Sequence, residues 1–361
     1  MFGTRLSKKQ WILLTAGLAT AVLCLVMCKY LAKPVKKQSY DTAVRAAEQM
    51  QRCMDAVKEE KLARGIEIVP EDRFSTGLIG EDYNFITTTS GDLAAKRTTA
   101  DPNMAAVMVF MLEQAGLKSG DRLGCNFSGS FPAMNIATLC ACDALGVVPV
   151  YICSCGASNW GANNPDLTFP EMAMVLYDRG LVSTAPALIT PGGGDDIGAG
   201  VDSDLFSQIW KRVQALPCPT MQEADYAKNI AARKALLDGE HIKCFISVGG
   251  NITSLGYNMI SGVIGQGILK TKIPTLNSKS GLLEIYLHEG MPTVLILNIR
   301  QLAADHGFSF DPDTLSPVGS GSIYYKTQYP VILILAALAA ELAFLILYRK
   351  EKIANAGKTE I

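Results

Sequence analysis

The chain is poor in the side chains and loops that most often identify an enzyme by sequence. It has three histidines, His241, His288 and His306, and they are far apart along 361 residues. A Walker loop ends in Gly-Lys-Ser/Thr, whereas the glycine-rich stretch 262–271 places Lys270 three residues after its last glycine. We therefore do not expect the chain to be an ATP-using ligase itself.

The chain also has almost no net charge, because 33 Lys and Arg residues nearly balance 34 Asp and Glu residues. The terminal apolar segments and their flanks hold eleven of the basic residues and only three of the acidic ones, which leaves the middle with 22 basic and 31 acidic residues, a net charge of −9. A domain with this charge does not attract a polyanion by its bulk charge. Nucleic acid is therefore not an expected partner.

Histidine is also missing near the cysteines that are closely paired in the sequence. The ten cysteines include two Cys-x-Cys pairs, Cys140/Cys142 and Cys153/Cys155, but zinc sites usually space their ligands by two to four residues. Residues 140 and 142 would also point to different sides of a helix. We expect small, buried, apolar cysteines, and neither a metal nor another cofactor is predicted.

What the chain does have is one long apolar run near each end. Residues 11–31 lack charge before Lys29 and are long enough to cross a hydrocarbon core of about 30 Å. This apolar stretch is longer than that of a secretory signal, so we interpret it as an uncleaved anchor. Residues 331–348 form the second predicted span. The count of basic flanking residues favours a two-pass protein of the cell membrane with both termini in the cytoplasm and the intervening domain, 38–329, outside it.

A single acid, Glu341, lies inside the second predicted span. A carboxyl group at membrane depth is costly unless it is protonated or paired. Two interpretations remain open: Glu341 bonds within the helix pair, or it contacts a partner membrane subunit.

Residues 121–160 form the unit around which the domain is predicted to be built. An apolar run, 123–127, ends at Ser128-Gly129-Ser130, a helical pattern follows, and a second apolar run, 147–153, comes after Gly146. A strand, helix and strand in this order form a parallel pair with a right-handed crossover. The first turn lies at a helix N-terminus and suits an anion. The polar loop after the second strand is expected beside it, so that both border one crevice.

Strand and helix patterns continue to alternate beyond this unit. Gly192-Gly193-Gly194-Asp195-Asp196 and Gly249-Gly250-Asn251 follow two of the strands. The alternation predicts an α/β fold with a mainly parallel, Rossmann-like sheet. The strands are expected at 187–190, 242–248 and 293–297, and the helices at 101–115, 168–180, 205–216 and 225–237.

Two segments precede the central unit. Residues 41–64 have apolar side chains at helical spacing and are expected to form a stalk or packing helix. Residues 74–100 form a long polar loop, and in a compact domain such a loop is either functional or disordered. The apolar residues Leu78, Ile79, Phe85 and Ile86 favour order.

Three stretches together resemble a known protein family. They are 80–99, with Ile86-Thr87-Thr88-Thr89 and Gly91-Asp92-Leu93-Ala94; 128–137, with Ser128-Gly129-Ser130; and 156–165, with Ser158-Asn159-Trp160-Gly161. They are similar to the poly-γ-glutamate system protein family, the W component of a bacterial capsule machinery, over roughly 41–323. The resemblance implies an accessory role in synthesis or export of the polymer. It also implies, as partners, the poly-γ-glutamate synthetase and its membrane subunits, and, as ligand, glutamate or poly-γ-glutamate.

A site for such a ligand needs donors that hold a carboxylate at fixed positions. Polar loops at the strand ends supply hydroxyl, amide and cationic donors, although the same residues also suit helix capping and loop bonding. The predicted binding residues are Thr87, Thr88, Thr89, Arg97, Thr98, Ser130, Ser158, Asn159, Trp160, Asn163, Asn164, Gly249 and Gly250.

Two other classes of function remain as alternatives. In the first, Ser128 is the nucleophile of a hydrolase or transferase that acts on the polymer γ-amide, and Lys96 with Asp92 replaces a histidine base. The sequence around Ser128 lacks both glycines of the Gly-x-Ser-x-Gly nucleophile turn. In the second, the domain is a phosphosugar-binding module of the isomerase type. The acids Asp195 and Asp196 are expected to belong to a solvated turn rather than to an ion site.

Overall fold

The computed structural model describes residues 6–258 and 265–356. Part of the glycine-rich stretch at 262–271 therefore lies outside the described residues. The chain divides into two compact units. One comprises the two terminal segments, Met1–Lys37 and Tyr325–Ile361, and the other is Gln38–Tyr324.

The terminal unit is a pair of long helices with a short antiparallel ribbon. Helix α1 (Lys8–Leu31) starts at a capping box formed by Ser7 and Gln10, and α13 (Val331–Ala356) packs along it. Strand β1 (Lys33–Lys36), which follows α1, pairs antiparallel with β10 (Tyr325–Gln328), which precedes α13. Both helices are long and apolar enough to cross a membrane, with mean hydropathies of 2.3 and 2.6 over an 18-residue window of each. This is compatible with a two-pass membrane protein.

The carboxyl group of Glu341 lies on the contact between these two helices. A Cβ atom on Gly17 would be 3.0 Å from Glu341 Oε2, so the missing side chain at position 17 leaves room for the acid. Glu341 Oε1 is buried and has no hydrogen-bond partner among the described residues.

The second unit is an α/β sandwich around a six-stranded sheet. The strands lie in the order β6 (Leu188–Thr190), β3 (Val148–Ser154), β2 (Arg122–Phe127), β7 (Cys244–Val248), β9 (Thr293–Ile296) and β8 (Gly267–Leu269). Five strands are parallel, and β8 is antiparallel to β9. The predicted α/β class and mostly parallel sheet are confirmed. The short edge strand β8 was not predicted, because its three residues carry no clear periodic signal.

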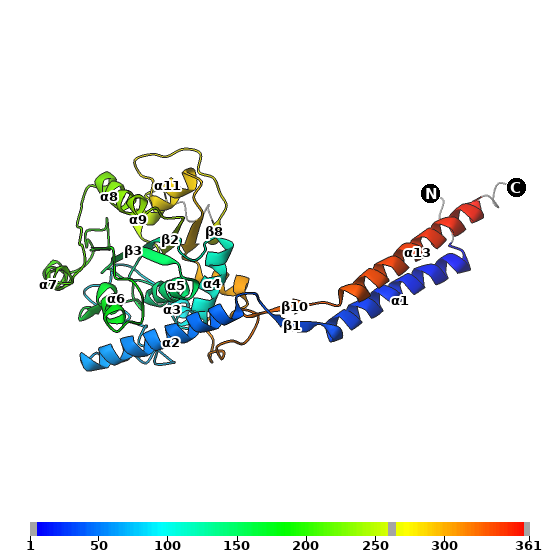
Figure 1. Cartoon of the computed structure of the whole chain (residues 1–361), viewed down its shortest axis with the longest axis horizontal. Coiled ribbons are helices and arrows are strands. Elements are labelled where there is room, and N and C mark those ends of the chain that lie inside the picture. Colours follow the sequence, from blue (N-terminus) through cyan, green and yellow to red (C-terminus); the bar gives the residue numbers. More distant parts are fainter. Residues whose placement is uncertain (1–5, 259–264, 357–361) are drawn as a thin grey trace. The chain divides into compact units, whose positions relative to one another are not determined.

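The central strands are nearly continuous apolar runs, as expected for a sheet that is covered on both faces. Every residue of β7 is buried, and β2 and β3 each expose only their first residue. Such runs, without polar alternation, are typical of parallel strands between two helical layers. One face is covered by α2 (Tyr40–Ala63), α4 (Asn103–Gln114) and α5 (Pro132–Leu145), which pack on one another. Helices α8 (Tyr226–Gly239), α9 (Ile252–Leu255) and α11 (Leu282–His288) cover the other face (Figure 1).

Two elements near the start of the unit clarify what the sequence left open. Helix α2 buries an apolar face that includes Met50 and Val57 against α4 and α5, so it packs inside the α/β unit. The last part of the 74–100 segment is a helix, α3 (Leu93–Thr99), because the Asp92 carboxylate accepts the N–H groups of Ala94 and Ala95 and starts it.

The remaining elements complete the strand-to-helix connections. They are β4 (Asn163–Asn164), β5 (Leu167–Thr168), α6 (Phe169–Asp178), α7 (Ser203–Gln214) and α12 (Ile299–His306). A capping box between Thr168 and Glu171 starts α6, as its sequence indicates. The four cysteines of the two Cys-x-Cys pairs are free and buried, as expected.

Candidate functional site

A large pocket of the α/β unit lies where the carboxyl ends of the parallel strands meet. The strand order reverses between β2 and β7, because the chain from β2 moves outward through β3 and β6 and then returns to β7 and β9. Open α/β sheets bind ligands at such a reversal. A pocket of about 860 Å³ occurs here, and loops after all five parallel strands line it. The sheet topology thus gathers turns that are up to 172 residues apart in the sequence, from Ser128 to Arg300.

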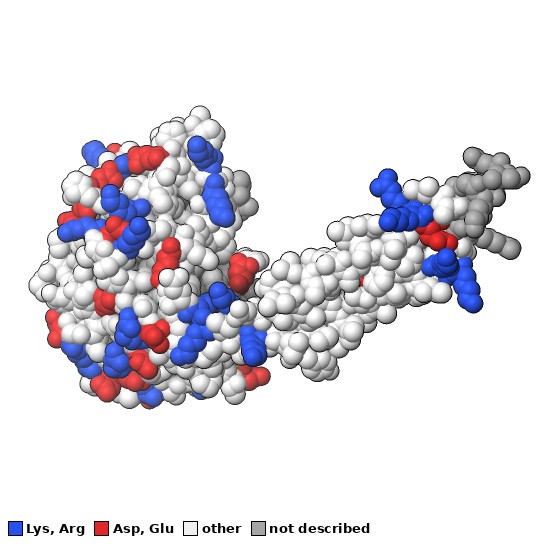
Figure 2. All heavy atoms as spheres, turned by 45° about the vertical axis from the view of Figure 1, so that its right-hand side comes forward, with Lys and Arg blue, Asp and Glu red and all other residues white. Residues whose placement is uncertain are grey.

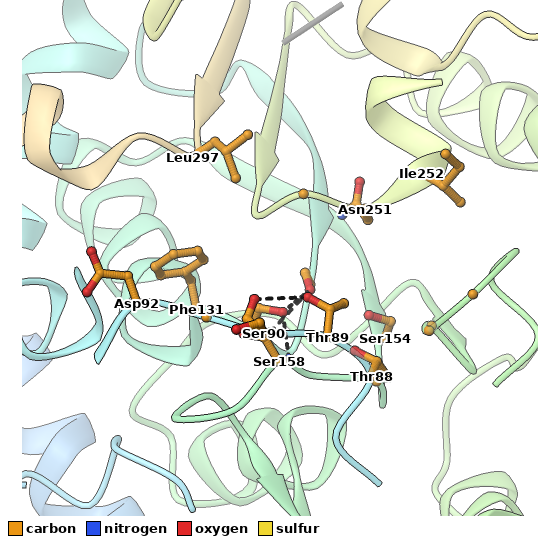
Figure 3. A pocket seen from close by; sticks show the side chains of 18 of the residues that line it. Thr88, Thr89, Ser90, Asp92, Phe131, Ser154, Ser158, Asn251, Ile252 and Leu297 are labelled. Atoms are coloured by element: carbon orange, nitrogen blue, oxygen red, sulfur yellow. Dashed lines mark hydrogen bonds between the residues drawn. The ribbon is translucent and has the colours of Figure 1, made fainter. Parts of the chain in front are cut away.

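The wall of this pocket combines hydroxyl groups and glycine-rich backbone with apolar side chains. Figure 3 shows Thr88 and Ser158 on one side and Asn251 and Leu297 on the opposite side. The lining residues are Thr88–Asp92, Ala95, Lys96, Ser128, Ser130, Phe131, Ser154, Gly156, Ser158, Gly192–Asp196, Ala199, Gly200, Gly250–Thr253, Leu297–Arg300 and Phe310.

Lys96 is the cation most deeply set in the wall. Helix α3 directs it toward the turns after β2 and β3, and its residue is only 2% exposed. Its Nζ donates to Ser158 Oγ at 2.9 Å and to the carbonyl oxygen of Ser130, and it lies 3.8 Å from the centre of the Phe131 ring. Burial lowers the pKa of Lys96 to about 7, although the nearby Asp92 carboxylate opposes this shift. Near neutral pH the amine is therefore poised between its charged and neutral forms.

Three serines from two loops are joined beside Lys96. Ser128 Oγ donates to Ser130 Oγ at 3.0 Å, and the Ser158 N–H donates to Ser130 Oγ at 3.0 Å. The Asn135 amide in α5 donates to the Ser128 carbonyl oxygen at 2.9 Å and fixes this turn to the helix that follows it. The predicted proximity of the two turns is confirmed by these contacts.

Glycine is required where the turns after β3 and β6 approach each other. A Cβ atom on Gly156 would lie 2.5 Å from the Gly193 nitrogen and 3.1 Å from Thr88 Cγ2. Any side chain at position 156 would therefore push apart three segments of the pocket wall.

Several predicted binding residues lie behind the wall and hold the loops together. The Asn163 side chain is buried and donates to the Glu81 carbonyl oxygen at 2.9 Å and to Thr87 Oγ1 at 3.0 Å. Asn164 donates to the Glu81 carboxylate at 2.8 Å, and the Trp160 N–H donates to the Glu81 carbonyl oxygen at 2.7 Å. These bonds fasten the loop after β3 to the 74–92 segment, which positions Thr88.

Arg97 and Thr98 also point away from the pocket. The Arg97 guanidinium forms two hydrogen bonds with the Asp311 carboxylate, at 2.7 and 2.6 Å, and Thr98 Oγ1 accepts the Asp311 N–H at 2.8 Å. Asn159 accepts the Gly91 N–H and donates to Asp82, and Gly249 lies beneath Ser128. Of the residues predicted for the site, those that line the pocket are Thr88, Thr89, Asp92, Lys96, Ser128, Ser130, Ser158 and Gly250.

Asp92 does not contact the Lys96 amine as a partner in a catalytic pair. Its carboxylate is used as the cap of α3, and it acts on Lys96 through its charge alone. The hydrogen bonds of Lys96 Nζ in the described chain lead to Ser130 and Ser158 and not to Ser128.

An ion pair that the sequence did not reveal lies under the pocket. Arg233 of α8 is 1% exposed, and its guanidinium donates to Asp196 at 2.5 Å, to Asn126 at 2.7 Å, to Asn229 at 2.8 Å and to Thr190 at 2.9 Å. The expectation of a solvated turn is thus wrong for Asp196, which is buried by this contact, whereas Asp195 is exposed. No local pattern could have shown it, because Arg233 sits in an otherwise ordinary polar helix segment.

Arg300 is a second pocket cation that the sequence did not single out. Arg300 is the second residue of α12, shortly after the end of β9. Its guanidinium carbon lies 3.9 Å from the centre of the Phe310 ring, and both residues line the pocket. No group of three or more His, Cys, Asp or Glu side chains in the described ranges could hold a metal ion.

No protein-family model matches this chain, and no curated protein or solved structure matches it either.

Proposed function

We propose that this chain is a membrane-anchored accessory component of poly-γ-glutamate synthesis or export, and that its α/β unit binds glutamate or an end of the polymer. The pathway comes from the resemblance of the three polar stretches. The ligand class comes from the pocket itself. We also propose that the sheet is Rossmann-like and that its ligand binds where the strand order reverses, between β2 and β7.

The observation that carries the ligand assignment is the position of Lys96. Its amine lies in the wall of the pocket beside hydroxyl groups and glycine-rich backbone, so a carboxylate is the ligand group that it suits best. A bound carboxylate would stabilise the charged amine, and binding near pH 7 would therefore be accompanied by proton uptake.

The charges around the pocket favour a ligand that carries both signs. Lys96 and Arg300 are cations of the wall, while Asp92 and Asp195 are acids of the same wall. Asp196, a further acid, is already paired with Arg233. Free glutamate and the amino-terminal residue of the polymer both combine an ammonium group with carboxylates. The inner part of the polymer is purely anionic and fits this mixture less well.

The location proposed for the α/β unit is outside the cytoplasm. Basic residues gather at the outer ends of α1 and α13 (Figure 2), where Lys9 and Glu351 lie 3.9 Å apart. Basic flanks favour the cytoplasmic side of a membrane. We propose that the poly-γ-glutamate synthetase and its membrane subunits are the partners of the two spans.

Calorimetric titration of the full chain in detergent with L-glutamate and with a short γ-linked oligomer tests the ligand. Wild type should bind at least one of them, and Lys96→Ala should weaken binding by about 10-fold or more, because hydrogen bonds to charged groups contribute roughly 1.5–3 kcal/mol. Lys61→Ala is the matched control, since Lys61 is a buried lysine that donates to the Ile79 carbonyl oxygen outside the pocket.

Absence of binding by wild type would overturn the ligand assignment. Binding of a sugar phosphate but not of glutamate would instead favour the phosphosugar-binding alternative.

A further inference from the structure

The Lys96 amine is hydrogen-bonded to the hydroxyl group of Ser158. The distance from Nζ to Oγ is 2.9 Å, which is hydrogen-bond distance, and both residues line the pocket. Both are also nearly buried, since Ser158 is 4% exposed and Lys96 is 2% exposed. A nucleophile and its base are recognised by this kind of contact at the wall of a cleft.

We propose that Ser158 and Lys96 form a nucleophile–base pair that transfers the acyl group of an amide or ester bound in the pocket. The assignment differs from the alternative based on Ser128. Ser128 Oγ is bonded to Ser130 Oγ at 3.0 Å and accepts the Ser130 N–H at 3.2 Å. It therefore braces its own turn, whereas Ser158 Oγ directly contacts the amine at 2.9 Å and donates a longer hydrogen bond, of 3.3 Å, to the Asn159 carbonyl oxygen.

The surroundings of Lys96 suit the role of a base. Only a neutral amine can accept a proton, and burial lowers the pKa of Lys96 to about 7. The Asp92 carboxylate on α3 opposes the shift by its charge. The other charged groups that line the pocket are Asp195 and Asp196 after β6 and Arg300 on α12. A base with a pKa near the working pH is the most effective in proton transfer.

The reaction balances without a further reagent except water or an acceptor amine. Ser158 Oγ attacks the carbonyl carbon while its proton passes to the neutral Lys96 Nζ. The bond from the carbonyl carbon to the leaving nitrogen or oxygen then breaks, and the leaving group takes that proton from Nζ. An ester on Ser158 results. Water releases a carboxylic acid from it with Lys96 again as base, or an amine takes the acyl group to form a new amide.

The inference rests on the proposed function for its substrate class. In that setting the bond that is cut or re-formed is the γ-amide between a glutamyl residue and its neighbour, held by its charged end groups. The chemical role of Ser158 can be tested without knowing the natural substrate.

The test is labelling of the full chain in detergent with a fluorophosphonate probe, followed by mass spectrometry of the peptides. Wild type should be phosphonylated on Ser158, at a rate that rises with pH through about 7 and then levels off. Ser158→Ala should remove this label. Lys96→Arg keeps a positive charge but provides no base, and it should slow labelling by about 100-fold or more, the usual lower range for general-base assistance.

Two control variants separate a loss of chemistry from a loss of folding. Ser203→Ala removes an exposed serine at the start of α7, and Lys61→Met removes a second buried lysine, whose amine donates to the Ile79 carbonyl oxygen outside the pocket. Both should keep the wild-type labelling rate within about threefold, with thermal unfolding recorded for every variant.

The proposal is overturned if wild type is not labelled above Ser158→Ala, if the label lies on Ser128, or if the rate does not change between pH 6 and pH 8. These outcomes are distinct from failure of the proposed function. If Ser158 is labelled but glutamate does not bind, the Ser158–Lys96 pair is supported and the proposed ligand is wrong. If glutamate binds but Ser158 is not labelled, the ligand is supported and the pair is wrong.

Discussion

Replacing Asp196 by Asn should destabilise the α/β unit through the buried Arg233 beneath the pocket. The two side chains are 6% and 1% exposed, and their closest atoms are 2.5 Å apart. Asn has nearly the same shape as Asp, so packing is preserved and the change removes one negative charge. The guanidinium then remains buried without a compensating charge.

The loss of stability expected for Asp196→Asn depends on the hydrogen bonds that Arg233 retains. Removing one partner of a buried ion pair costs about 3–5 kcal/mol. Arg233 still donates to Asn126, Asn229 and Thr190, and the new amide oxygen can accept one hydrogen bond. We therefore expect the lower end, about 3 kcal/mol, which is a large share of the roughly 5–15 kcal/mol that stabilise a domain.

Urea unfolding of the full chain in detergent, followed by tryptophan fluorescence, measures this change. Trp160 and Trp210 lie in the α/β unit and report on it, while Trp11 lies in α1. With a slope of about 3 kcal/mol per M, the midpoint should fall by about 1 M.

The matched control is Asp313→Asn, which removes the same charge from the ion pair with Arg73 at 3.4 Å, where Asp313 is fully exposed. Its midpoint should equal that of wild type, because exposed pairs are screened by water. If Asp196→Asn shifts the midpoint no more than this control does, the ion pair does not hold the pocket floor, and the reasoning fails.

Three further predictions concern the same unit. The pKa of Lys96 is lowered to about 7 from the ordinary 10.5, so unfolding takes up a proton between these values; wild type should gain urea stability relative to Lys96→Met as pH rises from 7 to 10, and a constant difference would contradict the burial of the amine. A Cβ on Gly80 would overlap the Gly161 carbonyl oxygen, so Gly80→Ala should lower the melting temperature by several degrees and weaken ligand binding. Gly239→Ala, where a Cβ meets nothing within 4 Å, is its control and should be neutral or stabilising. Protease added to intact cells should cleave the α/β unit if it lies outside the cytoplasm, and full protection would place it inside.

Much of the fold could be read from the sequence because its signals are local. The apolar runs that end at Phe127, Cys153 and Val248 need only their own residues to predict buried strands, and β2, β3 and β7 occur there. The capping carboxylate of Glu171 and the glycine after α5 likewise act within one turn of chain. The antiparallel edge strand β8 was missed because three residues carry too little pattern.

The candidate site could be predicted only in outline. The rule that parallel strands end at one edge of a sheet brought the turn at 128–130 and the loop at 154–164 together, and residues of both line the pocket with Thr88 and Lys96. The same rule could not tell a side chain that faces the pocket from one that faces the loop behind it. Asn163 and Arg97 both look like ligand donors in the sequence, yet Thr87, Glu81 and Asp311 occupy them.

The sequence by itself determined the alternation of strands and helices, the two apolar terminal helices and the polar character of the strand-end turns, because these depend on neighbours within a few residues. Only the tertiary structure decided that Lys96 meets Ser158 across 62 residues and that Arg233 meets Asp196 across 37. The order in which strands join the sheet sets which distant side chains share one buried space. Burial in that space, rather than residue type, lowers the pKa of Lys96 toward neutrality.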